Sequence, residues 1–139
     1  MSHIAKIELE IKDLQSLKEA CKRLGFEFVP EQKSYKWYGK WVGDAPMPEG
    51  ISMEQLGKCD HAIRVPGAEY QIGVVKRNEK YLLLWDSWYE GGLEAEIGRD
   101  GGLLKQAYAI ESIKKVVRLK NYRLREVKTD QGIRLTLRV

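Results

Sequence analysis

The N-terminal segment alternates apolar and polar residues from Ile7 to Ile11, which is the period of a strand with one buried face. Asp13 then stands where a helix N-cap is expected, and apolar residues recur at spacings of three and four as far as Leu24. Gly25 supplies the left-handed residue with which many helices end. The pattern therefore predicts one strand followed by one amphipathic helix.

The middle of the chain predicts short strands separated by loops. Residues 26–29 and 61–65 each have the character of a short strand that stops at a proline. Residues 33–42 are rich in aromatic side chains, which favour strands. Prolines and glycines between 43 and 57 predict a surface loop there.

Two hairpins are predicted in the second half of the chain. Residues 70–76 and 80–88 are joined by a short polar turn. The second arm is apolar from Tyr81 to Trp85, so we expect both of its faces to be covered. Residues 122–128 and 133–139 flank an Asp-Gln-Gly turn, and the last arm alternates almost completely.

A long helix is predicted between the hairpins, from 103 to 119, with Asp100 as a candidate N-cap. Its buried stripe is expected to consist of Leu103, Ala107, Ile110, Ile113 and Val117. Strands outnumber helices, and most joins are hairpins. The chain is therefore predicted to form a single α+β domain over 1–139, with an antiparallel-rich sheet of about six or seven strands and two helices packed on one face.

The composition is that of a globular protein, because 43% of the residues are hydrophobic and 32% are charged. No apolar run approaches the roughly 20 residues that span a bilayer, and the N-terminus lacks the segments of a signal peptide. The two cysteines, Cys21 and Cys59, do not make a disulfide framework. These features predict a cytoplasmic protein away from the membrane, and nothing in them indicates a metal or a cofactor.

The net charge of +4 weakly favours anionic partners. From Lys114 to Arg125 there are six basic residues and no acidic one. Such a run is typical either of a surface that meets phosphates or of a solvated helix end, where lysines oppose the helix dipole.

Aromatic and basic side chains are interleaved between Lys33 and Trp41. As a strand, this stretch would place on opposite faces the sets Tyr35, Trp37, Trp41 and Lys36, Tyr38, Lys40. Aromatic rings stack on bases while lysines meet phosphates, so such a surface suits a nucleotide or a single-stranded nucleic acid. The alternative is a half-buried strand with its aromatic rings in the core.

Three further segments carry candidate chemistry. Asp86 follows an apolar run between two tryptophans, and it suits either a general acid or base or a cap of the strand end through a backbone hydrogen bond. Cys59 and His61 offer either a nucleophile pair or an ordinary strand entry, and they are too few for a zinc site. Arg99 lies in a glycine-rich segment before a predicted helix, which is either an anion site or a plain connection.

Several stretches, in order along nearly the whole chain, carry a resemblance to a known family: the Met1-Ser2-His3 opening with Asp13-Leu14, CDHAIR at 59–64, YQIG at 70–73, LWDSW at 84–88, LKQAYA at 104–109 and GIRLTL at 132–137. The set resembles the hypothetical chloroplast frame 35-like proteins (domain of unknown function 1257) of plastids, cyanobacteria, other bacteria and phages. The stretch from Trp37 to Lys58 is longer here than in the plastid members. The resemblance implies a compact fold, no catalytic residue and an adaptor role beside ATPase systems.

Taken together, the sequence favours a non-catalytic binding module. Its partner would be a protein assembly or an anionic small molecule, such as a nucleotide signal that a phage protein sequesters. The expected contact residues are Tyr35, Lys36, Trp37, Lys40, Trp41, Arg64, Asp86, Trp88 and Arg99. The alternatives are a single-stranded nucleic-acid-binding domain that uses residues 33–41 and the basic run, and an enzyme centred on Asp86 or on Cys59 and His61. Free edge strands also predict a homodimer.

Overall fold

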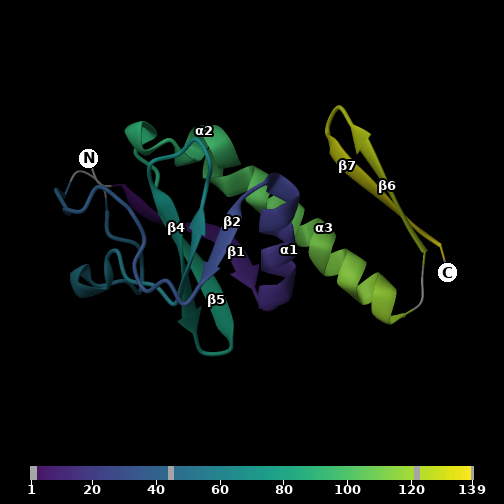
Figure 1. Cartoon of the computed structure of the whole chain (residues 1–139), viewed down its shortest axis with the longest axis horizontal. Helices are drawn as coiled ribbons and strands as arrows, with labels where there is room; N and C mark the ends of the chain where they lie inside the picture. The colour runs from purple at the N-terminus through teal and green to yellow at the C-terminus, as the bar shows by residue number, and fades with distance from the viewer. Residues whose placement is uncertain (1–2, 44–45, 121–122, 139) are drawn as a thin grey trace.

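The computed structural model describes residues 3–43, 46–120 and 123–138 (Figure 1). The strands are β1 (Ile4–Ile11), β2 (Glu27–Pro30), β3 (His61–Arg64), β4 (Gln71–Arg77), β5 (Lys80–Asp86), β6 (Arg123–Thr129) and β7 (Gly132–Arg138). The helices are α1 (Leu14–Leu24), α2 (Leu93–Ile97) and α3 (Gly102–Leu119), with 3-10 turns η1 (Met53–Gln55), η2 (Tyr89–Gly91) and η3 (Arg99–Gly101).

The described strands form two antiparallel sheets. Five of them make one sheet in the order β1-β5-β4-β3-β2, and β6 pairs only with β7. The α+β class is therefore confirmed. The predicted strands are divided between a large sheet and a separate hairpin, because β6–β7 lies beside the second half of α3 and apart from the large sheet (Figure 1).

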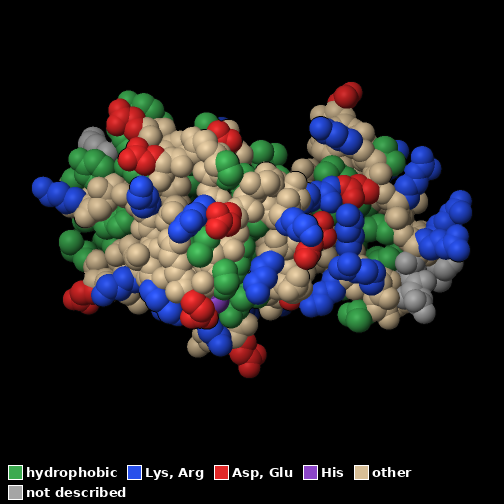
Figure 2. All heavy atoms as spheres, viewed as in Figure 1, with side chains coloured by type: hydrophobic (Ala, Val, Ile, Leu, Met, Phe, Trp, Pro, Cys, Tyr) green, Lys and Arg blue, Asp and Glu red, His purple; other side chains and the backbone are tan. Residues whose placement is uncertain are grey.

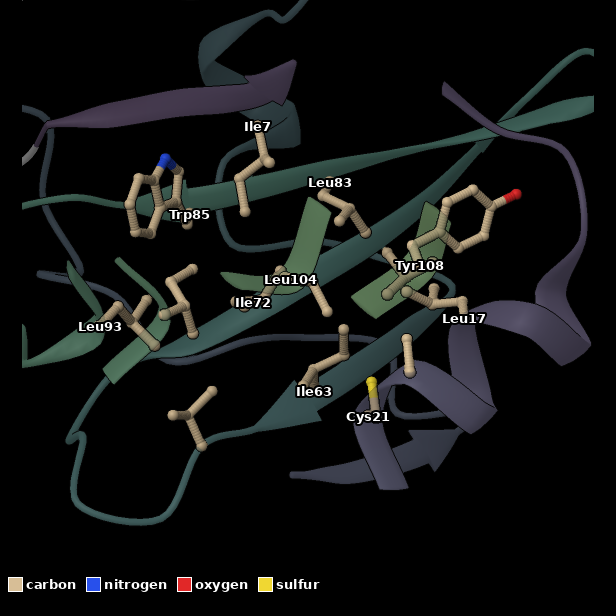
Figure 3. Close-up of a cluster of buried hydrophobic side chains, with 14 of the residues drawn as sticks. Ile7, Leu17, Cys21, Ile63, Ile72, Leu83, Trp85, Leu93, Leu104 and Tyr108 are labelled. Atoms are coloured by element: carbon tan, nitrogen blue, oxygen red, sulfur yellow. The ribbon is translucent and has the colours of Figure 1, made fainter. Parts of the chain in front are cut away.

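One face of the large sheet is covered by helices, as predicted. Side chains of the sheet such as Ile72 and Leu83 pack in one cluster with Leu17 of α1 and Leu104 of α3 (Figure 3). The local signals that set α1 are also confirmed. The side chain of Asp13 accepts the N–H of Gln15, and Gly25 is left-handed.

The other face of the large sheet is covered by residues 31–60, which we call the crossing segment. Among its described residues the 3-10 turn η1 is the only named helix or strand. The side chains of Tyr35 and Ile51 in the crossing segment pack against Val75 and Leu84 of the sheet. Neighbouring residues of β5 thus face different layers, because side chains alternate along a strand. The prediction that both faces of this strand are covered is confirmed.

The strand predicted over residues 33–42 is wrong. The stretch makes only an isolated bridge, between Ser34 and Lys58, and Gly39 turns the chain at a φ of 89°. The alternation of the side chains still has an effect, because Tyr35 is buried and Lys36 is exposed. The aromatic residues pack down onto a face of the sheet and do not extend its edge.

The start and the buried stripe of α3 also differ from the prediction. Gly101, with a φ of 74°, precedes the helix and Asp100 does not cap it. Leu103 and Ile113 are exposed, whereas the buried residues are Leu104, Ala107, Tyr108, Ile110 and Val117. The second half of α3 runs beyond the large sheet, so its apolar residues have fewer surfaces to pack against (Figure 1).

The hairpin β6–β7 is anchored to both long helices by one carboxylate. Glu126 forms ion pairs with Arg23 of α1 and with Lys114 of α3, the latter at 3.1 Å. A two-stranded hairpin alone is marginally stable in water, so these contacts help to hold it in place. Among the described residues, no helix has the length and apolar character needed to cross a membrane.

Candidate functional site

Asp86 ends β5, and its side chain is 0% exposed. Its Oδ1 accepts the backbone N–H groups of His3 at 3.0 Å and Trp88 at 3.1 Å, and its Oδ2 accepts that of Tyr38 at 3.0 Å. Three donors on one carboxylate give charge-assisted hydrogen bonds that fix its position. Asp86 therefore joins the N-terminal segment, the crossing segment and the chain after β5, which confirms the predicted strand-end cap.

Two aromatic rings of the crossing segment, those of Tyr35 and Trp37, pack directly against glycines. Tyr35 is 3% exposed, and its ring lies against Gly73 of β4 so closely that a Cβ there would collide with it. The indole of Trp37 lies on Gly57 in the same manner. Tyr35 therefore cannot stack on a ligand, and the predicted aromatic platform is wrong for this ring. Trp37 and Trp41 are half-buried against the same cluster.

Lys36 and Arg64, two of the predicted contact residues, do come together. They line a groove of about 400 Å³ at the start of β4. Glu27 and Glu69 line it too, and Arg64 lies 3.8 Å from Glu27. The two cations and the two carboxylates balance, so the groove has no surplus positive charge with which to hold an anion.

Cys59 and His61 do not form a pair. The thiol of Cys59 donates to the backbone oxygen of Gln32 at 3.2 Å, and Nδ1 of His61 accepts the N–H of Glu31 at 3.0 Å. Burial raises the pKa of the Cys59 thiol to about 11, which leaves it protonated and weakly nucleophilic at neutral pH. His61 thus attaches the crossing segment to β3, and Cys59 joins two parts of the crossing segment. No group of described side chains could hold a metal ion.

The remaining predicted residues lie apart from that groove. Arg99 is exposed in η3, in the helix layer, whereas Lys40 is exposed in the crossing segment on the other face of the sheet. Trp88 is half-buried and meets the ring of His3 edge-on, with centroids 5.1 Å apart. The structure therefore distributes the predicted contact residues over several surfaces.

The predicted basic run is divided by the fold. Lys114 is paired with Glu111 and Glu126, and Lys115 lies 2.8 Å from Asp13. These two lysines are paired with carboxylates of α3, of β6 and of the N-cap of α1. The other end of the run, Arg123 and Arg125, lies in β6, where these two residues form no ion pair with another described residue.

One face of β6–β7 carries four cations and no acidic residue. The register of the two strands places Arg123 opposite Arg138, Arg125 opposite Thr136, and Val127 opposite Arg134. All four arginines are exposed, and together they form what we call the arginine face. Arg123, Arg125 and Arg138 line a groove of about 310 Å³ on it. On the side shown in Figure 2, lysine and arginine side chains gather around this end of the molecule.

The arginine face is not neutralised by the protein. None of its four side chains forms an ion pair with another described residue. Glu126, the one acidic residue of the two strands, belongs to the opposite face and is occupied by Arg23 and Lys114. Arg123 and Arg138 lie directly across from each other, an arrangement that destabilises a hairpin through repulsion of like charges.

The opposite face of the hairpin is apolar apart from Glu126 and Lys128. Leu124, Leu135 and Leu137 line a groove of about 470 Å³ together with Ile113 and Val116 of α3. The hairpin is therefore amphipathic. Its apolar side faces α3, so the arginine face points away from that helix.

No family model, curated protein or solved structure matches this chain. The resemblance to the chloroplast frame 35-like family stays a prediction.

The sequence pattern contained a signal for the arginine face that our contact predictions did not use. The last arm alternates Arg134, Thr136 and Arg138 with apolar residues, and the preceding arm carries Arg123 and Arg125 at the same spacing. A two-residue connection between the arms then sets a register in which both sets share one face. Combining the two arms would have identified this surface.

Proposed function

We propose that this chain is a non-catalytic binding domain whose ligand is a polyanion, and that the arginine face of β6–β7 is its contact surface. The observation that supports this proposal is the set of four exposed arginines on one side of one hairpin, which form no ion pair with the acidic residues that the structure describes. The guanidinium group is a planar fork that suits phosphate and carboxylate oxygens, and it stays charged at every physiological pH.

The distribution of charge along the chain supports the same proposal. Residues 111–139, which we call the C-terminal arm, hold nine basic and three acidic residues, whereas residues 1–110 hold fifteen basic and seventeen acidic ones. The positive charge of the protein therefore resides in the arm. Such a concentrated field attracts a polyanion and raises its rate of association.

Charges on exposed strands also have an ordinary role, which is to prevent sheets from aggregating at their edges. That role needs charge at an edge, and one or two lysines are enough. The four arginines instead occupy a face of the hairpin, and two of them repel each other across the strands. A ligand that supplies negative charge would remove this repulsion.

The balanced groove of Lys36 and Arg64 is a weaker candidate for the anionic ligand of this domain. Its acidic residues Glu27 and Glu69 oppose an anion. The arginine face holds a comparable concave surface without acidic lining.

The test uses immobilised heparin, a polyanion without bases, and two variants that remove the same net charge. One variant carries R123T, R125T, R134T and R138T, and the other carries K33T, K36T, K40T and K58T in the crossing segment, where all four lysines are exposed. We expect the arginine variant to elute at clearly lower salt than the lysine variant, because charge location and not net charge decides retention.

Circular dichroism of both variants would check that each is folded. Equal elution of the two variants would overturn the proposal. Earlier elution of the lysine variant would move the site to the crossing segment, in agreement with the sequence-based alternative.

A further inference from the structure

We infer that the polyanion is double-stranded DNA in its B form, with the arginine face of β6–β7 entering the major groove. This inference rests on the proposed function and adds the class of ligand. It follows from three properties of the hairpin: its lack of aromatic side chains, its width and the spacing of its arginines.

The hairpin has no surface on which unpaired bases could stack. Between Arg123 and Arg138 there is no aromatic residue. Proteins that bind single strands combine a basic groove with exposed rings, and each stacked base contributes about 1–3 kcal/mol. The exposed rings Tyr38 and Tyr89 belong to the crossing segment and to η2, so neither is part of the arginine face. A duplex, whose bases are already stacked, needs no such rings.

The width of the hairpin matches one particular groove. Paired strands lie about 4.8 Å apart, and a two-stranded ribbon with its side chains enters the major groove of B-form DNA, which is roughly 12 Å wide. The minor groove of undeformed B-form DNA, at about 6 Å, is too narrow for a ribbon, and widening it costs deformation energy. The major groove of an RNA duplex is deep and narrow, so it also excludes the hairpin.

The spacing of the arginines matches the repeat of the duplex. From Arg123 to Val127 the face advances four residues, which is about 14 Å along a strand. The same length of DNA holds about four base pairs. Arg123 and Arg125 stand on β6, and Arg134 and Arg138 stand on β7, so cations face both walls of the groove.

The rest of the chain is expected to contribute little to the contact. Residues 1–110 carry more acidic than basic side chains, so they do not attract phosphates as a whole. Binding is therefore limited to about four phosphates, which predicts a slope of about −3.6 in a plot of log affinity against log salt. Affinity would then fall about 150-fold between roughly 50 and 200 mM salt.

The experiment measures fluorescence anisotropy with three labelled probes of one mixed sequence: a DNA duplex of roughly 20 base pairs, its single strand, and the matching RNA duplex. Anionic phosphatidylserine vesicles serve as a fourth probe, followed by co-sedimentation. We expect the DNA duplex to bind at least about tenfold more tightly than the single strand or the RNA duplex, with the stated salt slope.

The variants of the heparin test are used again. The arginine-to-threonine variant should lose most of its affinity for the duplex, and the lysine variant should keep it. A third variant, R123K, R125K, R134K and R138K, keeps the charge but not the fork geometry. It should be retained on heparin and should bind the duplex several-fold more weakly than the unmodified protein.

The outcomes separate this inference from the proposed function. Equal or tighter arginine-dependent binding of the single strand or of the RNA duplex would overturn the DNA assignment and leave the polyanion proposal standing. Arginine-dependent binding of vesicles without binding of DNA would do the same. If the arginine-to-threonine variant matched the lysine variant with every probe and on heparin, both proposals would be overturned.

Discussion

The crossing segment and the C-terminal arm both carry basic side chains close to apolar ones, yet the fold treats them in opposite ways. In the crossing segment the rings of Tyr35 and Trp37 pack against glycines. Backbone groups of the segment form hydrogen bonds with the side chains of Asp86, Cys59 and His61. In the arm, four arginines have no partner within the described chain, and only Glu126 ties the hairpin to the helices by ion pairs. A stretch rich in basic and aromatic residues is therefore a good candidate for ligand binding only when the fold leaves its side chains exposed and without ion pairs.

The substitution Asp86→Asn would break the anchoring of the crossing segment most severely. An amide has one oxygen instead of two, and its NH₂ group would face a backbone N–H. We expect a loss of about 3 kcal/mol in the free energy of unfolding, because the lost hydrogen bonds involve a buried charged acceptor. Urea denaturation followed by circular dichroism measures this change.

Asp100→Asn is the matched control for this charge removal. Asp100 is exposed, and its φ of 55° lies in the left-handed region that asparagine tolerates. Its effect should stay within about 0.5 kcal/mol. Equal urea midpoints for the two variants would contradict the role given to Asp86.

Gly73→Ala would test the seating of Tyr35. The added Cβ would collide with the ring, so either the ring or β4 must shift. We expect a loss of about 2 kcal/mol, the usual cost of overpacking a core. Gly102→Ala is the control, because nothing lies near its Cβ position and its φ of −55° is helical. That variant should be as stable as the unmodified protein or more stable by about 0.5 kcal/mol.

Glu126→Gln would test how the hairpin is attached to the two long helices. It removes the ion pairs to Arg23 and Lys114, which are half-buried. Hydrogen exchange should become about fivefold faster at the amides of β6 and β7, which corresponds to about 1 kcal/mol of local stability. Amides of the large sheet should be unchanged. Glu111→Gln, which removes a carboxylate between the helices, should leave the hairpin amides protected.

The smallest effect is expected from Arg138→Thr, which removes the like-charge pair with Arg123. The hairpin amides should exchange more slowly, by a factor that corresponds to about 0.3 kcal/mol. Arg134→Thr is the control, since it makes the same chemical change opposite the uncharged Val127. If both variants slowed exchange equally, repulsion between Arg123 and Arg138 would not explain the gain.

Much of the fold followed from local patterns. The helix from Leu14 to Leu24 was predicted because Asp13 and Gly25 mark its ends, and the hairpin of β6 and β7 was predicted because its arms alternate around a turn. The stretch 33–42 was mispredicted because aromatic residues favour strands only where a strand partner is available. Here Ala62 and Gly73 are small, and their face of the sheet accepts the ring of Tyr35 instead.

By itself, the sequence determined the local elements, the α+β class and the positive charge of the last thirty residues or so, because capping, alternation and charge are properties of neighbours along the chain. The tertiary structure alone decided which side chains are buried or paired within the protein and which stay free to bind a ligand. It buried Tyr35, surrounded the Asp86 carboxylate with donors, and left the four arginines of the arginine face without ion pairs to other described residues. The physical reason is that burial and neutralisation depend on surfaces brought together from distant parts of the chain, which no local pattern records.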